Sequence, residues 1–137
     1  MNISPKENIK QIYSHCIRFI EQFDDNFDNL IFYGNSGLGK TFLCNCIAKD
    51  LLDRGKTVIY LTAFQLFQLF EQVRFNKDDE ENSSRNYLDT IFTVDLLIID
   101  DLGTEFSTSL TGSELFNCLN SRLLDKKHTI ISTNLSP

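Results

Sequence analysis

One stretch of the chain constrains its fold more than any other. Residues 34–41 read Gly-Asn-Ser-Gly-Leu-Gly-Lys-Thr, which fits the pattern G-x-x-x-x-G-K-[ST] of a phosphate-binding P-loop. The stretch follows an apolar run at 30–33 that is typical of a buried strand, and a helical stretch opens at Thr41. Because a P-loop joins a strand to a helix, the pattern and its setting both predict phosphate binding.

The residue types of this loop suit a nucleoside triphosphate. Glycines let successive backbone N–H groups point at phosphate oxygens, and the following helix adds the unpaired N–H groups of its N-terminus. We expect Lys40 to reach the β- and γ-phosphates and the Thr41 hydroxyl to be a ligand of Mg²⁺. The expected nucleotide contacts are Gly34, Asn35, Ser36, Gly37, Leu38, Gly39, Lys40, Thr41 and Phe42.

The composition is that of an ordinary globular protein, with 42% hydrophobic and 23% charged residues. The 137 residues fit one domain, with an N-terminal helix and linker over 1–29 and a P-loop core over 30–137. The sequence has neither a membrane-spanning apolar run nor a secretory leader, so we expect a cytoplasmic protein without membrane contact. The formal net charge of -6 argues against a broadly basic nucleic-acid surface.

The four cysteines do not follow metal-ligand spacing. Cys44 and Cys46 both fall on the helix after the P-loop, where cysteine usually behaves as a small buried hydrophobe. We therefore interpret them as core residues.

Apolar spacing and turn signals predict alternating helices and strands. Helices are expected at about 5–23, 41–53, 62–75, 87–92 and 111–127, and strands at 30–33, 57–61, 95–101 and 128–133. Capping boxes are expected at Ser4, Thr62 and Thr111. The alternation predicts an α/β fold with a parallel sheet.

The same pattern predicts which segments are buried. The helix over 41–53 is apolar nearly all round, and the Phe and Leu residues of 64–70 are expected in the core. The polar, acidic stretch 76–86 is expected to be a solvated loop.

Polar residues follow the predicted strands directly, where the carboxyl ends of parallel strands form one edge. Asp100 ends an apolar strand, from which a carboxylate can hold Mg²⁺ beside Thr41, and Asp101 could orient or deprotonate the attacking water. Asn134 could place its amide against the γ-phosphate. The structural alternatives are a turn at 101–103 and the turn chemistry of Asn before Ser-Pro.

Three stretches together resemble a known family. They are the P-loop, Leu-Leu-Ile-Ile-Asp-Asp-Leu-Gly at 96–103, and Ile-Ile-Ser-Thr-Asn-Leu-Ser-Pro at 130–137. They are similar to the AAA+ ATPases that load the bacterial replicative helicase, the DnaC/DnaI type, and to the related IstB-like transposition helpers. The resemblance covers nearly the whole chain. It implies a P-loop three-layer sandwich, ATP binding, slow hydrolysis, self-association with nucleotide at subunit interfaces, contact with single-stranded DNA, and a helicase or transposase partner.

The resemblance assigns family roles to individual residues of this sequence. Lys40 and Thr41 match the Walker A lysine and threonine, Asp100 the Walker B metal-site aspartate, and Asn134 the sensor-1 asparagine. Asp101 stands where most AAA+ proteins have glutamate, which implies slow hydrolysis. The resemblance thus implies catalytic roles for Lys40, Asp101 and Asn134.

Other family parts lie outside the sequence. The arginine finger and the helical lid with its sensor-2 arginine would follow Pro137, and the helicase-binding domain would precede Met1. We therefore expect an ATPase core that binds nucleotide modestly and hardly hydrolyses it alone. Arg122 is interpreted as an ordinary exposed helix arginine.

Three rival functions compete with this interpretation. A GTPase would use Asp100 to Gly103 as D-x-x-G and residues 76–79 as N-K-x-D, but these occur in the wrong order. A P-loop small-molecule kinase would need an arginine-bearing lid, which is not visible after the fourth strand. A binding module that uses nucleotide only as a switching ligand remains open.

Overall fold

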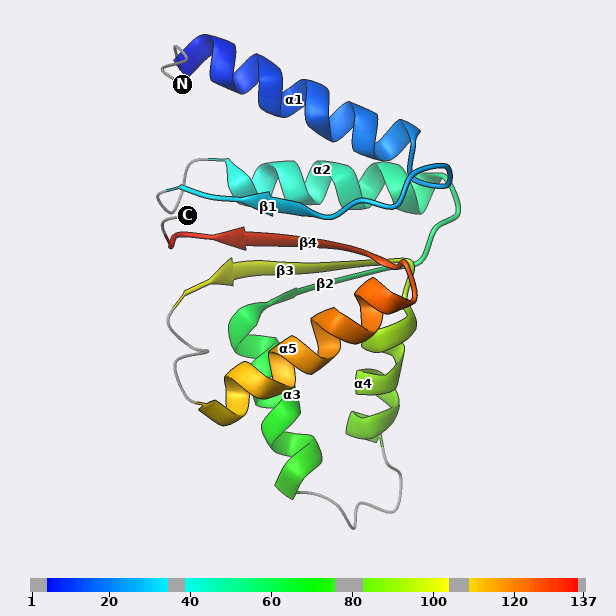
Figure 1. The fold of residues 1–137 in the computed structure, drawn as a ribbon, viewed down its shortest axis with the longest axis vertical. Coiled ribbons are helices and arrows are strands. Elements are labelled where there is room, and N and C mark those ends of the chain that lie inside the picture. The colour runs from blue at the N-terminus through cyan, green and yellow to red at the C-terminus, as the bar shows by residue number, and fades with distance from the viewer. Residues whose placement is uncertain (1–4, 35–38, 76–82, 104–108, 136–137) are drawn as a thin grey trace.

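The computed structural model describes residues 5–34, 39–75, 83–103 and 109–135, with the backbone alone for 5–8 and 109. Helices and strands alternate along the chain, apart from two consecutive helices between the second and third strands (Figure 1). The elements are α1 (Pro5–Glu21), β1 (Leu30–Phe32), α2 (Lys40–Asp53), β2 (Val58–Thr62), α3 (Ala63–Phe75), α4 (Ser83–Thr93), β3 (Leu96–Leu102), α5 (Ser109–Leu124) and β4 (His128–Thr133).

The four described strands form one parallel sheet in the order β1-β4-β3-β2. The apolar β3 lies inside the sheet, and its residues from Leu96 to Asp100 are all buried. A strand buried on both faces needs apolar residues on both, which explains the unbroken run Leu96 to Ile99. The predicted parallel α/β fold is confirmed.

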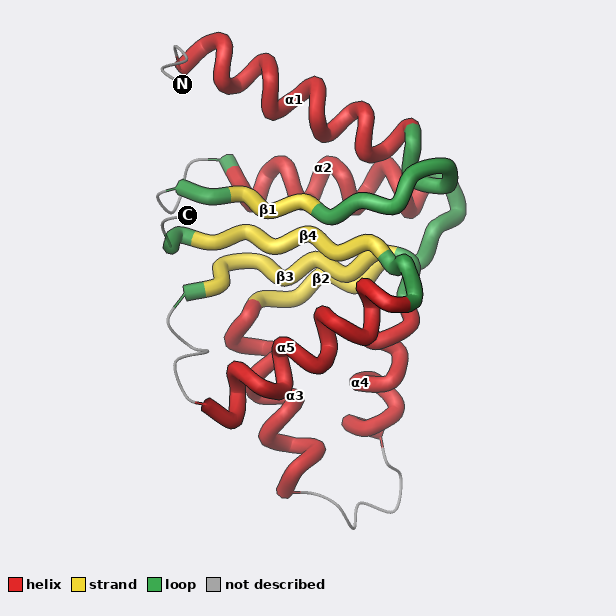
Figure 2. The backbone as a smooth tube through the Cα atoms, viewed as in Figure 1, coloured by secondary structure: helices red, strands yellow, loops and turns green. Residues whose placement is uncertain are grey.

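Helices cover both faces of the sheet in three layers (Figures 1 and 2). One core cluster joins α1 and α2 to alternate β3 residues, Leu96 and Ile98. The other joins α3, α4 and α5 to Leu97 and Ile99. Because side chains alternate along a strand, consecutive β3 residues stabilise opposite layers, each buried leucine or isoleucine by about 1.5–3 kcal/mol.

The predicted helix boundaries are confirmed in part. The capping box at Thr62 is present: Gln65 N–H donates to Thr62 Oγ1 over 3.1 Å, and Thr62 N–H donates to Gln65 Oε1 over 2.9 Å. The box at Thr111 is wrong, since α5 already begins at Ser109 and Glu114 instead pairs with Arg74. The predicted loop over 76–86 is too long, because α4 begins at Ser83. Ser4 and residues 76–82 lie outside the described residues.

Some apolar residues predicted to be buried are exposed. On α2 these are Phe42, Cys46 and Leu52, because the sheet covers only one side of the helix. Phe64 at the start of α3 is also exposed, at 60%. The composition of these helices therefore predicted more buried side chains than the structure has. Cys44 is buried as expected.

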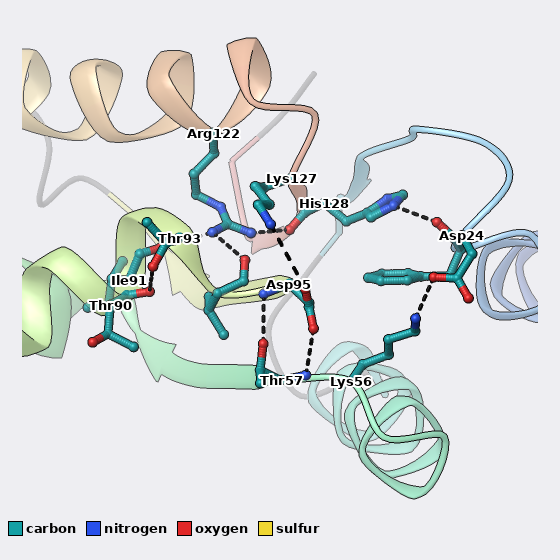
Figure 3. A network of polar contacts seen from close by, with 12 residues as sticks. Asp24, Lys56, Thr57, Thr90, Ile91, Thr93, Asp95, Arg122, Lys127 and His128 are labelled. Atoms are coloured by element: carbon teal, nitrogen blue, oxygen red, sulfur yellow. Dashed lines mark hydrogen bonds and ion pairs between the residues drawn. The ribbon is translucent and has the colours of Figure 1, made fainter.

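Arg122 corrects a further prediction, because its side chain is fully buried. Its Nη1 donates to the backbone oxygens of Ile91 and Val94 and its Nη2 to that of His128 (Figure 3). Its Nε donates to Thr129 Oγ1 over 3.0 Å. Burial lowers the pKa of the guanidinium to about 10. Arg122 thus joins the end of α4 to the start of β4, at the opposite end of the sheet from the N-terminus of α2.

Within the described part of the chain, no helix has both the length and the apolar character needed to cross a membrane.

Candidate nucleotide-binding site

The predicted site residues that the structure describes lie near the carboxyl ends of the strands. The C-terminal ends of β1, β4 and β3 and the N-terminus of α2 lie at the same edge of the molecule (Figure 1). Lys40 Nζ donates to the backbone oxygen of Gly34 and, over 2.9 Å, to that of Thr133. The α2 lysine therefore touches the ends of β1 and β4, two strands that are adjacent in the sheet.

The loop's flanking glycines have backbone angles that other residues rarely adopt. Gly34 has a φ of 135° and Gly39, the N-cap of α2, a φ of 88°. Side chains with a Cβ are strained in this left-handed region, so the pattern requires glycine at both positions. The remaining predicted contacts Asn35, Ser36, Gly37 and Leu38 lie outside the described residues, and Phe42 is 69% exposed on α2.

Three hydroxyl groups donate hydrogen bonds to the buried carboxylate of Asp100. Thr41 Oγ1 donates to Oδ2 over 2.9 Å, and the Tyr60 hydroxyl donates to the same oxygen. Ser132 Oγ donates to Oδ1. The Walker A threonine and the Walker B aspartate, predicted from separate motifs, are therefore in direct contact.

These bonds favour the ionised form of Asp100. Burial on its own would raise its pKa, but the hydrogen bonds from Ser132, Tyr60 and Thr41 outweigh burial and lower it below the ordinary value. Burial and the bond to Asp100 raise the pKa of Tyr60. At neutral pH the pair is therefore a carboxylate and a neutral phenol, and the phenol remains a hydrogen-bond donor.

Asp101 differs from its neighbour in backbone and exposure. The register between β3 and β4 shifts between Ile99 and Leu102, and Asp101 has a φ of 59° with an exposed side chain. Its N–H donates to Ser132 Oγ over 3.1 Å. Asp101 therefore lies in an irregular part of β3, where a left-handed residue costs of order 1–3 kcal/mol and marks a functional candidate.

Asn134 follows β4 directly and is exposed, next to the Thr133 backbone oxygen that Lys40 contacts. Thr133 Oγ1 donates to the Leu102 backbone oxygen over 2.6 Å, which fixes the end of β4 against β3. The predicted neighbourhood of Asn134 and the Asp100 strand is confirmed by the strand order. The roles of Asp101 and Asn134 toward a nucleotide stay predictions.

Sequence reasoning missed two site residues, Tyr60 and Ser132. It assigns Tyr60 only to a strand, although Thr62 pairs with Asp100 across β2 and β3, so that Tyr60 faces the same side of the sheet. Ser132 lies on β4, the other neighbour of β3. A signal was present in the sequence: each of the two strands beside β3 carries a hydroxyl residue, and β3 carries the Asp100 carboxylate near its end.

The residues present fit Mg²⁺ and phosphate. An ionised carboxylate and a hydroxyl are oxygen donors, which Mg²⁺ prefers, and Lys40 and the N-terminus of α2 provide positive charge for phosphates. Burial raises the pKa of the Cys44 thiol to about 12, so this cysteine is a poor thiolate ligand.

Comparison with known proteins also indicates a nucleotide-binding protein. The family model described as "IstB-like ATP binding protein" matches residues 6–137. The chain belongs to the IstB-like ATP-binding protein family. Its parallel sheet with flanking helices is the AAA+ P-loop fold.

Several relatives are proteins of DNA replication. The chain is 30% identical over 121 residues to the replicative helicase loader DnaC of Escherichia coli K12, a match that covers 88% of this chain and 48% of DnaC. A structure of DnaI has a TM-score of 0.79 and 25% identity, covering 99% of this chain and 70% of DnaI. A replication initiator DnaA bound to AMPPCP and single-stranded DNA shares the fold, with a TM-score of 0.74 and 24% identity over 92% of this chain and 38% of DnaA. The chain thus spans about half the length of that DnaC.

Proposed function

We propose that this chain is the ATP-binding and ATP-hydrolysing core of a DNA-replication helicase loader, in which ATP and ADP switch helicase loading on single-stranded DNA. Family membership and the similarity to DnaC and DnaI support this function. The observation that carries it is the contact between Thr41 and Asp100, because it joins a P-loop hydroxyl to an ionised carboxylate. The two groups are the donor pair of a Mg²⁺–nucleotide site.

Each site residue has a distinct proposed role. Lys40 binds the β- and γ-phosphates, and Thr41 and Asp100 hold Mg²⁺, which when bound neutralises the charge that develops on the phosphates. Asp101 orients or deprotonates the attacking water, and Asn134 contacts the γ-phosphate. The carboxylate of Asp101 lies about 1.5 Å further back than that of a glutamate, which favours slow, switch-like hydrolysis.

The proposed partners follow from the family. They are a replicative helicase, single-stranded DNA, and further copies of the protein, which associate through an interface that includes the bound nucleotide. Support comes from the DnaA structure with bound single-stranded DNA and nucleotide analogue, and from the function of DnaC as a helicase loader. The described part of the chain has exposed basic residues on several elements, and we assign no DNA-binding residue.

A transposition helper is the second candidate function. It is favoured by the family model itself, which describes IstB-like proteins and matches nearly the whole chain. Pull-down of the protein with purified replicative helicase and with an IS21-type transposase, each in ATP and in ADP, separates the two. Nucleotide-dependent retention of the helicase supports the loader, and retention of the transposase alone would overturn it.

Nucleotide binding is tested first with the variant Lys40→Ala. Loss of the charged donor should weaken binding of fluorescent ATP and ADP about 10- to 100-fold. Lys49→Ala is the control, because Lys49 lies on the same helix with its side chain 83% exposed. Equal affinity of the Lys40→Ala variant and the unaltered protein would contradict nucleotide binding at this site.

A further inference from the structure

The Tyr60 hydroxyl has a specific partner at the candidate site. It donates to Oδ2 of Asp100, the same carboxylate oxygen that accepts the Thr41 hydroxyl. The opposite oxygen, Oδ1, accepts Ser132 Oγ. Each side of the carboxylate is therefore held by at least one hydroxyl.

The sheet explains why Tyr60 reaches this position. In the register of β2 and β3, Tyr60 lies opposite Ile98 and Thr62 lies opposite Asp100. Because alternate residues share a face, Tyr60 and Asp100 lie on the side of the sheet covered by α2, where the Tyr60 ring packs against the core cluster of α1 and α2. A phenylalanine would fill the same space, so the hydroxyl is what distinguishes this position.

We propose that Tyr60 is a positioning residue that holds the Asp100 carboxylate in the orientation that binds Mg²⁺. The inference rests on the proposed function, in which Thr41 and Asp100 hold the metal. Thr41 is itself an expected ligand, whereas Tyr60 and Ser132 donate to Asp100 without being ligands. Three hydroxyl donors leave the carboxylate spare acceptor capacity, since its two oxygens offer about four lone-pair positions.

Ser132 serves a second purpose that Tyr60 does not. Its Oγ also accepts the N–H of Asp101, so it supports the irregular backbone of β3 as well as the carboxylate. The donated bonds of Tyr60 and Ser132 differ in this respect, and replacing Tyr60 changes Asp100 with less effect on the backbone. Tyr60→Phe is therefore the cleaner test.

The experiment measures binding of fluorescent ADP to the 137-residue chain while Mg²⁺ is titrated, and again in EDTA. Tyr60→Phe should raise the Mg²⁺ concentration at half-maximal effect by about tenfold, the lower end of what loss of a partner behind a metal ligand costs. Binding in EDTA should be unchanged. Tyr87→Phe is the matched control, because Tyr87 is exposed on α4 in the opposite helix layer.

The outcomes separate a positioning role from a structural one. Equal weakening in EDTA and in Mg²⁺ would show that Tyr60 only supports the fold, and an unchanged or lower Mg²⁺ requirement would show that its hydroxyl is neutral or competes with the metal. Either result overturns the proposal. A circular dichroism melt in EDTA checks that the variant is folded.

A parallel Asp100→Asn variant tests the function on which the inference rests. If Asp100→Asn abolishes the Mg²⁺ effect and Tyr60→Phe leaves it intact, the role of Tyr60 is wrong and the metal site stands. If Mg²⁺ does not alter nucleotide binding in the unaltered protein, the metal site and the role of Tyr60 are both wrong.

Discussion

Thr41 donates its hydroxyl hydrogen to Oδ2 of Asp100 over 2.9 Å, which joins the first turn of α2 to the end of β3. The two residues are 59 positions apart in the sequence and belong to different motifs. Their contact places an ionised carboxylate beside the P-loop, where both side chains offer oxygen to one cation.

Replacing Thr41 by alanine should remove one of these oxygens. We expect the Mg²⁺-dependent part of ADP binding to weaken about tenfold, as for loss of a group that supports a metal site. Isothermal titration calorimetry with and without EDTA measures this difference. Thr93→Ala is the control, since Thr93 is an exposed threonine at the end of α4 whose hydroxyl bonds its own helix. Equal Mg²⁺ dependence in Thr41→Ala and Thr93→Ala would contradict the assignment.

Asp101→Asn should remove hydrolysis and spare ATP binding. Loss of a general base typically costs about 10²- to 10⁴-fold in rate, whereas the amide keeps the size of the side chain. Asparagine also tolerates the left-handed φ of 59°, so the backbone should not change. Phosphate release by the intact protein with its partners measures turnover, and Asp89→Asn on α4 is the exposed control. Unchanged turnover would rule out this role.

Arg122→Met should destabilise the fold strongly. The methionine fills much of the space but leaves the backbone oxygens of Ile91, Val94 and His128 without the buried donor seen in Figure 3. An unsatisfied buried group costs about 1–3 kcal/mol, so we expect a loss of about 3 kcal/mol or more in the free energy of unfolding. Urea denaturation measures it. Arg54→Met, which breaks an exposed pair with Asp50, should cost less than about 1 kcal/mol.

The sequence predicted the strands and the site motifs better than the helix environments. The apolar run of β3 and the β-branched β4 have one stable placement in a parallel sheet, and both strands were found within one residue of their predicted bounds. Thr41 and Asp100 could be paired because P-loop chemistry requires a carboxylate at a neighbouring strand end. Motifs of this kind occupy short stretches of sequence, so each can be recognised without knowing how the rest of the chain packs.

Burial of single side chains depends on the packing of several elements and was harder to predict. Arg122 looked like a surface residue because arginine on a helix usually is one, and its partners lie on α4 and β4. The hydroxyl of Tyr60 became informative only with the register of β2 and β3. Both residues are polar groups satisfied by long-range contacts, which sequence periodicity does not encode.

Asp95→Asn should make the stability of the fold change less with pH in the acid range. Asp95 accepts the Thr57 N–H over 2.9 Å and its own N–H donates to Thr57 Oγ1, just before β2 and β3 begin (Figure 3). The Thr57 N–H bond is the main reason why the pKa of Asp95 is lowered, against the opposing effect of burial. A carboxyl group whose pKa is lower in the folded state than in the unfolded state stabilises the fold at pH values above the unfolded pKa of about 3.9. This stabilisation disappears as the pH falls through the folded-state pKa.

The unaltered protein should therefore be more stable than Asp95→Asn at pH 7, and this difference should shrink as pH falls below the ordinary carboxyl value of about 3.9. Thermal melts from pH 7 to below that value measure the difference, with Asp53→Asn as the control because the Asp53 side chain is 70% exposed. A difference in melting temperature that stays constant over this range would exclude the carboxylate charge as its cause.

Cysteine labelling tests the two helix layers at once. Cys46 is exposed, whereas Cys16, Cys44 and Cys118 are buried, and burial raises the pKa of Cys44 to about 12 and that of Cys118 to about 11. Since the thiolate is the reactive form, one thiol per folded chain should react quickly with Ellman's reagent at about pH 8, and all four should react in urea. Cys46→Ser should abolish the fast reaction and leave the others unchanged. Fast reaction of Cys44 in the folded protein would contradict the packing of α2 against the sheet.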